Sequence, residues 1–225
     1  MTHTLTARAT ATPATAHSVP RLLLAGGITA GPLFLAAGLV QGLSRDGFDF
    51  TRNALSQLSL GGLGWIQVTA FLLTGALATA GAAGMRQVLR GAPGGTWAPR
   101  LIGVFGASFL VASFFPPDPG AGFPAGAPQA PPGTLSAHGA LHMAAAMTGF
   151  LALCAASLVL ARYFTARGER GWLLASRLVP AGVLAGFAAS AASVAAFTAG
   201  AGLGLLWLSA LTARLARPEP TAQHR

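Results

Sequence analysis

The chain has 225 residues, of which 8% are charged and 53% are hydrophobic, and its mean hydropathy is +0.60. Soluble domains contain about 25% charged residues, so this composition excludes an ordinary water-soluble fold and predicts an integral membrane protein. The net charge of +9 comes from fourteen arginines and five acids. The arginines form no patch interleaved with aromatic residues, which argues against a nucleic-acid-binding protein.

A polar tail precedes the first apolar segment. Residues 1–20 are rich in Thr and Ala and lack apolar periodicity, which predicts a disordered cytoplasmic tail. The apolar segment at 22–43 is longer than the core of a signal peptide, which has about 7–15 residues, so we expect it to remain as a membrane-spanning helix. Residues 21–215 are predicted to form one all-α transmembrane domain, followed by a second cytoplasmic tail over 216–225.

Further apolar segments match the thickness of a bilayer, which about 20 residues cross. They lie at 65–85, 101–115 and 139–161, the second of these being short. The last uncharged stretch, 178–213, would measure about 54 Å as one straight helix, whereas the hydrocarbon core is about 30 Å thick. We therefore expect two helices there, with a turn near 198–202, and an integral membrane bundle of six transmembrane helices in total.

The distribution of arginines supports six helices and predicts their orientation. With the N-terminus inside, twelve of the fourteen arginines lie in inner segments, and only Arg45 and Arg52 lie outside. Cytoplasmic loops of membrane proteins carry an excess of positive residues. We therefore predict a multi-pass protein of the cell (inner or plasma) membrane with both termini cytoplasmic. Five helices would place three of those twelve arginines outside.

Pairs of glycines four residues apart recur in the apolar segments, and this spacing lets helix backbones approach closely. The pairs are Gly27/Gly31, Gly38/Gly42, Gly182/Gly186 and Gly200/Gly204. They predict either packing inside the bundle, which we favour, or a homodimer through small-xxx-small helix faces. The lipid bilayer is the other expected partner.

Ionisable residues gather on the predicted outer side, in two segments. The first segment, 44–65, contains Arg52, which can hold an anionic headgroup through a bidentate contact or form a salt bridge to Asp49 or Asp118. Ser56 can contact a ligand, or it can cap a helix. The second segment contains five prolines and four glycines over 119–135, which predicts a mobile external loop without regular structure.

Two histidines begin the apolar segment that follows this loop. His138 and His142 are four residues apart and therefore share one face of a helix. Imidazoles at this spacing can bind zinc, with Asp118 as the candidate third ligand and water completing a tetrahedron. The alternatives are packing or hydrogen bonding at the interface, which we favour, and a metal-free ligand or proton site.

Several short motifs together resemble a known family. They are RNALSQL at 52–58 running to Gly61 and Gly64-Trp65, FPPD at 115–118, HGALH at 138–142 and LLW at 205–207. The pattern resembles DUF998, a family of bacterial and archaeal membrane proteins of unknown function, over roughly residues 21–215. The resemblance implies six transmembrane helices and no established activity.

The order of a serine, an aspartate and a histidine pair is also similar to that in a group of membrane hydrolases. This group includes the alkaline ceramidases and the progestin/adiponectin-receptor-type proteins, which hold zinc with three histidines. The similarity implies Ser56, Asp118, His138 and His142 as candidate catalytic and metal-binding residues. This chain lacks the third histidine, so an aspartate of the first outer segment would have to replace it.

These observations lead us to expect a non-enzymatic protein that binds a lipid, a small molecule or a partner at its outer face, through Arg52, Ser56 and Asp118. The alternative is a metal-dependent hydrolase, in which a zinc-bound water of lowered pKa attacks an amide or ester. Asp118 would then serve as ligand or base, and Ser56 or Arg52 would stabilise the oxyanion. A proton-coupled or ion-coupled transporter is disfavoured, because the apolar segments carry almost no ionisable residue at mid-depth.

Overall fold

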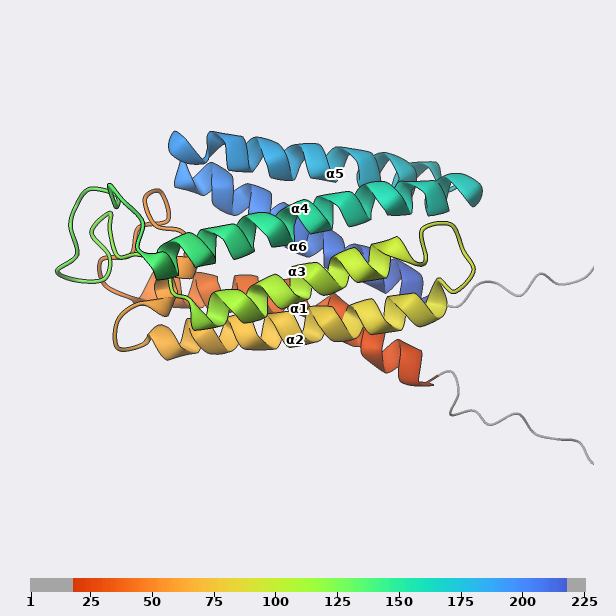
Figure 1. Cartoon of the computed structure of the whole chain (residues 1–225), viewed down its shortest axis with the longest axis horizontal. Helices are drawn as coiled ribbons and strands as arrows, with labels where there is room; N and C mark the ends of the chain where they lie inside the picture. The colour runs from red at the N-terminus through yellow and green to blue at the C-terminus, as the bar shows by residue number, and fades with distance from the viewer. Residues whose placement is uncertain (1–17, 218–225) are drawn as a thin grey trace, which may run out of the picture.

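The structure, a computed structural model, describes residues 18–217. These residues form six long α-helices and two short 3-10 helices, with no strand among them (Figure 1). Outside the described residues lie all but the first two residues of the predicted tail over 216–225 and all but the last three of the tail over 1–20. The elements are α1 (Ser18–Ser44), η2 (Leu55–Ser59), α2 (Gly64–Val88), α3 (Trp97–Phe114), α4 (Ala137–Ala166), α5 (Arg170–Ala188), η3 (Ala189–Ala191) and α6 (Val194–Ala216).

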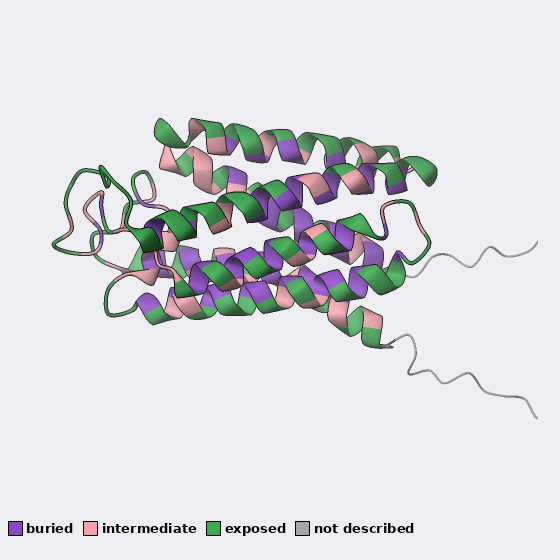
Figure 2. Cartoon of the chain, in the orientation of Figure 1, coloured by how far each residue is buried: buried purple, intermediate pink, exposed green. Residues whose placement is uncertain are grey.

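All six α-helices are long and apolar enough to cross a membrane. The shortest is α3, with 18 residues, and the longest is α4, with 30. Large apolar side chains are exposed on the outside of the bundle, among them Leu72, Val104, Leu151, Leu178 and Leu206. Exposed positions recur along the whole length of the helices, and not only at their ends (Figure 2). Hydrocarbon is the solvent that suits such a surface, and the predicted all-α bundle of six spans is confirmed.

The helices form a closed ring in chain order. Each packs on the next along the chain, and α6 returns to pack on α1. The loops that follow α1 and α3 lie together at one end of the bundle, on the left in Figure 1, and we call this the cap end. The loops that follow α2 and α4 lie at the opposite end, where Arg86, Arg90, Arg100, Arg167 and Arg214 are found. We call this the arginine-rich end.

The fifth helix begins earlier than the hydropathy pattern predicts. Arg170 and Arg177 lie within α5 and not in a loop before it. Charged residues interrupt an apolar segment in the sequence, but the backbone can remain helical where long side chains extend to the interface. Both arginine side chains are exposed, as this explanation requires.

The turn between the last two helices lies at 189–193, and the predicted turn at 198–202 is wrong. Ser193 begins α6, because its hydroxyl accepts a hydrogen bond from the Ala196 amide at 3.2 Å. Gly200 lies inside α6, against α5, and a Cβ added to Gly186 would stand 2.8 Å from the Gly200 Cα. The glycines that suggested a turn instead let the two helices approach closely.

The predicted glycine pairs pack inside the bundle. All eight glycines have neighbours from elsewhere in the chain where a Cβ would project. A Cβ on Gly27 would stand 2.8 Å from the Thr212 side chain, and one on Gly182 would stand 2.7 Å from the Leu203 side chain. Three of the pairs lie against other helices, whereas Gly38 and Gly42 lie against Leu55 and Phe50 of the segment after α1. The homodimer stays a prediction.

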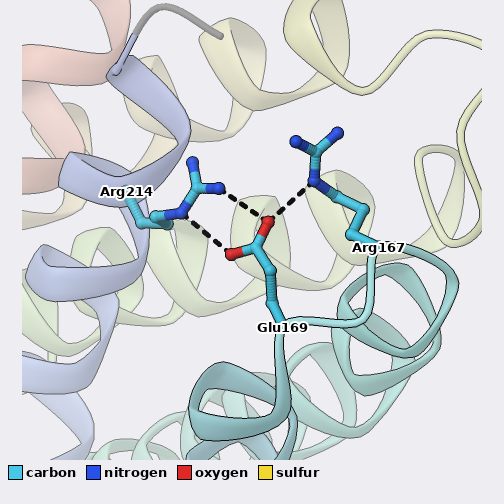
Figure 3. A network of polar contacts seen from close by, with 3 residues as sticks. All are labelled: Arg167, Glu169 and Arg214. Atoms are coloured by element: carbon cyan, nitrogen blue, oxygen red, sulfur yellow. Dashed lines mark hydrogen bonds and ion pairs between the residues drawn. The ribbon is translucent and has the colours of Figure 1, made fainter. Parts of the chain in front are cut away.

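An ion-pair cluster at the arginine-rich end joins the α4–α5 loop to the end of α6 (Figure 3). The Glu169 carboxylate accepts hydrogen bonds from Arg214 Nη2 at 2.6 Å and Nε at 3.0 Å, and from Arg167 Nε at 2.8 Å. Partial burial disfavours ionisation of Glu169, but these hydrogen bonds outweigh it and lower the pKa of the carboxyl. Glu169 therefore connects the loop before α5 to Arg214, which lies 45 residues further along the chain.

Candidate functional site

The two loops at the cap end are bonded to each other and form a folded cap, which we define as residues 45–63 and 115–136. Arg52 Nη2 donates to the Gln129 carbonyl at 2.9 Å. Asn53, which is almost fully buried, donates to the Ala121 carbonyl at 3.3 Å, and the Gln57 amide donates to the Gly120 carbonyl at 3.2 Å. Three polar side chains of the RNALSQL motif therefore hold the second loop against the first.

A cation–π contact lies in the interior of the cap. The Arg45 guanidinium carbon lies 4.8 Å from the centre of the Phe123 ring. Arg45 also donates to the Leu58 carbonyl and, at 2.6 Å, to the Leu60 carbonyl. Phe123 is 1% exposed, although it belongs to the loop richest in proline and glycine. Arg45 is half-buried, so the contact lies between the values for exposed and desolvated pairs, which are about 0.5 and 2 kcal/mol.

These contacts show that the loop at 119–135 is packed, while its mobility stays a prediction. The loop has no helix and contains an isolated bridge between Gly120 and Phe123. Main-chain hydrogen bonds also join Ala121 to Ala130 and Gly122 to Pro128. It is nevertheless held by Arg52 and Asn53 of the other loop and by the burial of Phe123. The sequence suggested mobility because proline and glycine prevent regular structure, but they do not prevent a loop from packing.

The Asp118 carboxylate lies at the N-terminus of α4. Its Oδ2 accepts a hydrogen bond from the Ser136 amide at 2.9 Å, and the Ser136 hydroxyl accepts one from the Gly139 amide at 3.1 Å. A side chain at Gly139 would overlap the carboxylate. A negative charge at this position is stabilised by the helix dipole. The observed contacts of Asp118 therefore support the start of a helix.

The two histidines have different surroundings. His142 is 3% exposed, and its Nδ1 donates to the Phe115 carbonyl at 2.8 Å, since a carbonyl can only accept. His138 is exposed, and its ring lies edge-on to Phe115 with 5.6 Å between the centres. Over residues 18–217, no three His, Cys, Asp or Glu side chains gather where they could hold one metal ion. The zinc site and the hydrolase that depends on it stay predictions.

Arg52 and Ser56 differ in what they contact. In the described chain, Arg52 forms no ion pair with Asp49 or Asp118, and it contacts Gln129 instead. The Asp49 carboxylate accepts from the side chain and the amide of Thr51, and these bonds lower the pKa of the Asp49 carboxyl. Ser56 lies in η2, where it faces a cavity beneath the cap. Of these two predicted ligand-binding residues, Ser56 lines the cavity and Arg52 holds the cap above it.

The cavity, which we call the chamber, has a volume of about 240 Å³ and lies in the cap half of the ring. Its roof is Ala54, Leu55 and Ser56 of the cap. Leu55 reaches over α1, since a Cβ on Gly38 would stand 3.0 Å from the Leu55 Cδ1. The chamber is therefore roofed by residues of the same motif whose polar neighbours hold the cap together.

One phenylalanine from each helix lines the chamber. They are Phe34, Phe71, Phe109, Phe150, Phe187 and Phe197, from α1 to α6 in order. Successive rings touch around the chamber, with centre-to-centre distances of 4.9, 5.5, 6.4, 5.1 and 4.8 Å. We call this set the phenylalanine arc. Sequence analysis missed it, because an apolar segment does not show which of its residues face the ring interior and which face lipid.

The chamber reaches the surface of the bundle beside α4. Met143 and Met147 line it and are 48% and 44% exposed, and Ser190 of η3 also lines it and is exposed. Helices α4 and α5 diverge toward the cap end (Figure 1). The mouth of the chamber therefore opens sideways, between α4 and η3. In a membrane this position faces lipid at the level where the cap begins.

A few polar side chains also line the chamber. Ser56, His142 and Ser190 lie at its cap end, and Ser108 lies deeper, on α3. The Ser108 hydroxyl donates to the Phe105 carbonyl at 2.7 Å, as a serine in an apolar helix commonly does. The chamber is consequently apolar along its depth and polar near its roof.

Comparison with known proteins identifies one family. The family described as "Protein of unknown function (DUF998)" matches residues 28–214, which include most of α1, the other five spans and both loops of the cap. No curated protein and no solved structure matches the chain. Because the match covers most of the sequence, the chain belongs to the DUF998 family, as its motifs predicted.

Proposed function

We propose that this integral membrane protein binds an amphiphile with a single apolar chain in the chamber, and that the amphiphile enters sideways from the bilayer. The observation that carries the proposal is the phenylalanine arc, in which all six helices contribute a ring to one open apolar space. Small-molecule sites typically measure about 300–1,000 Å³. A chamber of about 240 Å³ suits one chain or a small ring system, and not a whole two-chain phospholipid.

The energetics favour an occupied chamber. The wall atoms of an unfilled apolar space lack partner atoms, and these missing contacts cost free energy. Because the chamber is open at its mouth, a lipid chain can enter and supply them. A hydrocarbon chain that fills the space removes this cost and contacts the phenylalanine rings.

The polar residues suggest how the amphiphile is oriented. Ser56, His142 and Ser190 are near the roof, so the polar end of the ligand would lie under the cap, with its chain toward the middle of the bilayer. Hydroxyl and imidazole groups suit a hydroxyl, ester or amide better than a strongly charged headgroup. The bound form would therefore be a neutral or weakly polar lipid.

Photocrosslinking tests the proposal. The purified protein would be placed in nanodiscs that contain a diazirine-bearing monoacylglycerol, and the labelled peptides would be identified by mass spectrometry. We expect labelling of α4 around Met143 and Met147. An Ala146→Trp variant, which fills the chamber, should reduce this labelling at least about fivefold by occupying the cavity volume.

The matched control is Ala144→Trp. Ala144 lies on the same helix and is exposed, but it does not line the chamber. Labelling should then remain within about twofold of the parent protein, since the cavity is unchanged. Equal labelling of the two variants, or labelling confined to outward-facing residues, would reject the proposal.

A further inference from the structure

A second cavity lies at the arginine-rich end. It has a volume of about 350 Å³ and opens where the first turn of α1, the last turn of α2 and the ends of α4 and α6 meet. Three arginines line it, Arg21 from α1 and Arg214 and Arg217 from the end of α6. We call it the arginine cavity. It is separate from the chamber, and a ligand bound there is independent of the proposed function.

The arginine cavity carries a net positive charge. Arg214 pairs through its Nε and Nη2 with Glu169, whose single negative charge it shares with Arg167. Arg21 and Arg217 are exposed, and within residues 18–217 neither forms an ion pair. Two guanidinium groups from opposite ends of the chain therefore border one space without a counter-ion among the described residues.

The remaining lining indicates what kind of anion would bind. Among the apolar residues that line it, Val88 is 43% exposed, whereas Leu24 and Leu215 are buried, and Gln87 and Tyr163 add polar groups. Guanidinium groups bind phosphate oxygens in a bidentate manner. Basic pockets between transmembrane helices bind the headgroups of anionic lipids. An exposed apolar side chain beside two arginines is the combination that a phospholipid needs, since a soluble anion gains nothing from Val88.

We propose that the arginine cavity binds the phosphate group of an anionic phospholipid from the adjacent leaflet. The phosphate would lie between Arg21 and Arg217, with its acyl chains along the exposed side chain of Val88. The lipid would thus tie the first helix of the ring to the last, at the one junction of the ring that joins helices distant in sequence. On the topology that the arginines predict, the lipid belongs to the cytoplasmic leaflet.

Native mass spectrometry of nanodiscs made from equal parts of phosphatidylglycerol and phosphatidylcholine tests this site. The parent protein should retain phosphatidylglycerol about tenfold over phosphatidylcholine, a difference of about 1.4 kcal/mol. The double variant Arg21→Gln/Arg217→Gln should fall within about twofold of no preference, because it removes both phosphate-binding groups. If that variant does not fold, Arg21→Lys/Arg217→Lys should still lose at least about threefold, because lysine cannot bind bidentately.

The control is Arg86→Gln/Arg90→Gln, which removes the same charge from the same end but does not alter the cavity. It should keep the preference for phosphatidylglycerol. A second measurement separates a lipid from a free phosphate. Short-chain phosphatidylglycerol should raise the unfolding temperature of the protein in detergent, and glycerol phosphate at the same concentration should not. No preference in the parent protein, an equal loss in the control, or equal protection by glycerol phosphate would overturn the proposal.

Discussion

Arg52 donates a hydrogen bond to the main-chain carbonyl of Gln129, which lies 77 residues further along the chain. The bond joins the two loops of the cap above the chamber. Asn53 and Gln57, from the same motif as Arg52, also donate hydrogen bonds to the second loop. The three residues between them, Ala54, Leu55 and Ser56, form the roof of the chamber. The motif at 52–58 thus serves two roles, in which polar residues fasten the cap and small or apolar residues close the cavity.

Replacing Arg52 should loosen the cap. In Arg52→Ala, the loop at 119–135 loses a charged donor, so its amides should exchange faster with solvent. Because Arg52 is exposed, the loss of overall stability should be small, about 0.5–1 kcal/mol. Hydrogen–deuterium exchange in detergent measures both the exchange of the loop amides and the overall stability. The same substitution at exposed Arg90, outside the cap, should leave the loop unchanged, and unaltered exchange in Arg52→Ala would contradict the assigned role.

Arg45 should matter more than Arg52. It donates to two carbonyls and lies on the buried ring of Phe123. Arg45→Met keeps the apolar stem but leaves the carbonyls of Leu58 and Leu60 without this donor, so we expect a loss of about 2–4 kcal/mol, seen as a lower unfolding temperature. Arg45→Lys should recover only part of this. A variant as stable as the parent would show that these contacts are dispensable.

The contact between Asp118 and Gly139 predicts a non-additive pair. Gly139→Ala places a methyl group against the Asp118 carboxylate and should cost about 1–3 kcal/mol. In the double variant Asp118→Ala/Gly139→Ala the clash is absent. The stability losses of the two single variants, added together, should therefore exceed the loss of the double variant by at least about 1 kcal/mol. A double-mutant cycle in detergent supplies these values. Strict additivity would mean that the two residues do not touch.

Glu169 predicts a pH dependence of stability. Its folded pKa is lowered by Arg167 and Arg214, so the unfolded chain binds the proton more readily than the folded one. The contribution of Glu169 is therefore complete above its unfolded pKa of about 4.3–4.5, and is lost as the pH falls through the folded value. The parent protein should lose stability on acidification more steeply than Glu169→Gln. Parallel curves for the two proteins would show that the ion pairs contribute nothing.

The sequence predicted the spans because hydropathy and arginine placement are local and additive properties. It misplaced the turn before α6 because the glycines near Gly200 suit a turn and a helix contact equally well. It missed the cap because contacts such as Arg52 to Gln129 depend on which loops share an end of the bundle. It missed the phenylalanine arc for a related reason. Phe34 and Phe197 line the same cavity only because α6 packs against α1.

The candidate site was predicted in part. Ser56 and His142 line the chamber, whereas Arg52 fastens its cap and Asp118 supports the start of α4. The prediction grouped these residues by their side of the membrane, which the topology specifies. Their individual roles depend on distances of a few ångströms that spacing along the chain does not determine.

A structure determined by electron cryo-microscopy in nanodiscs made from a native lipid extract tests the central claim most directly. We predict elongated density inside the chamber, beside Phe109 and Phe150, that continues to the mouth at Met143 and Met147. A chamber closed by rearranged side chains, or one that holds only isolated waters, would contradict the claim that the six helices enclose the apolar chain of one amphiphile.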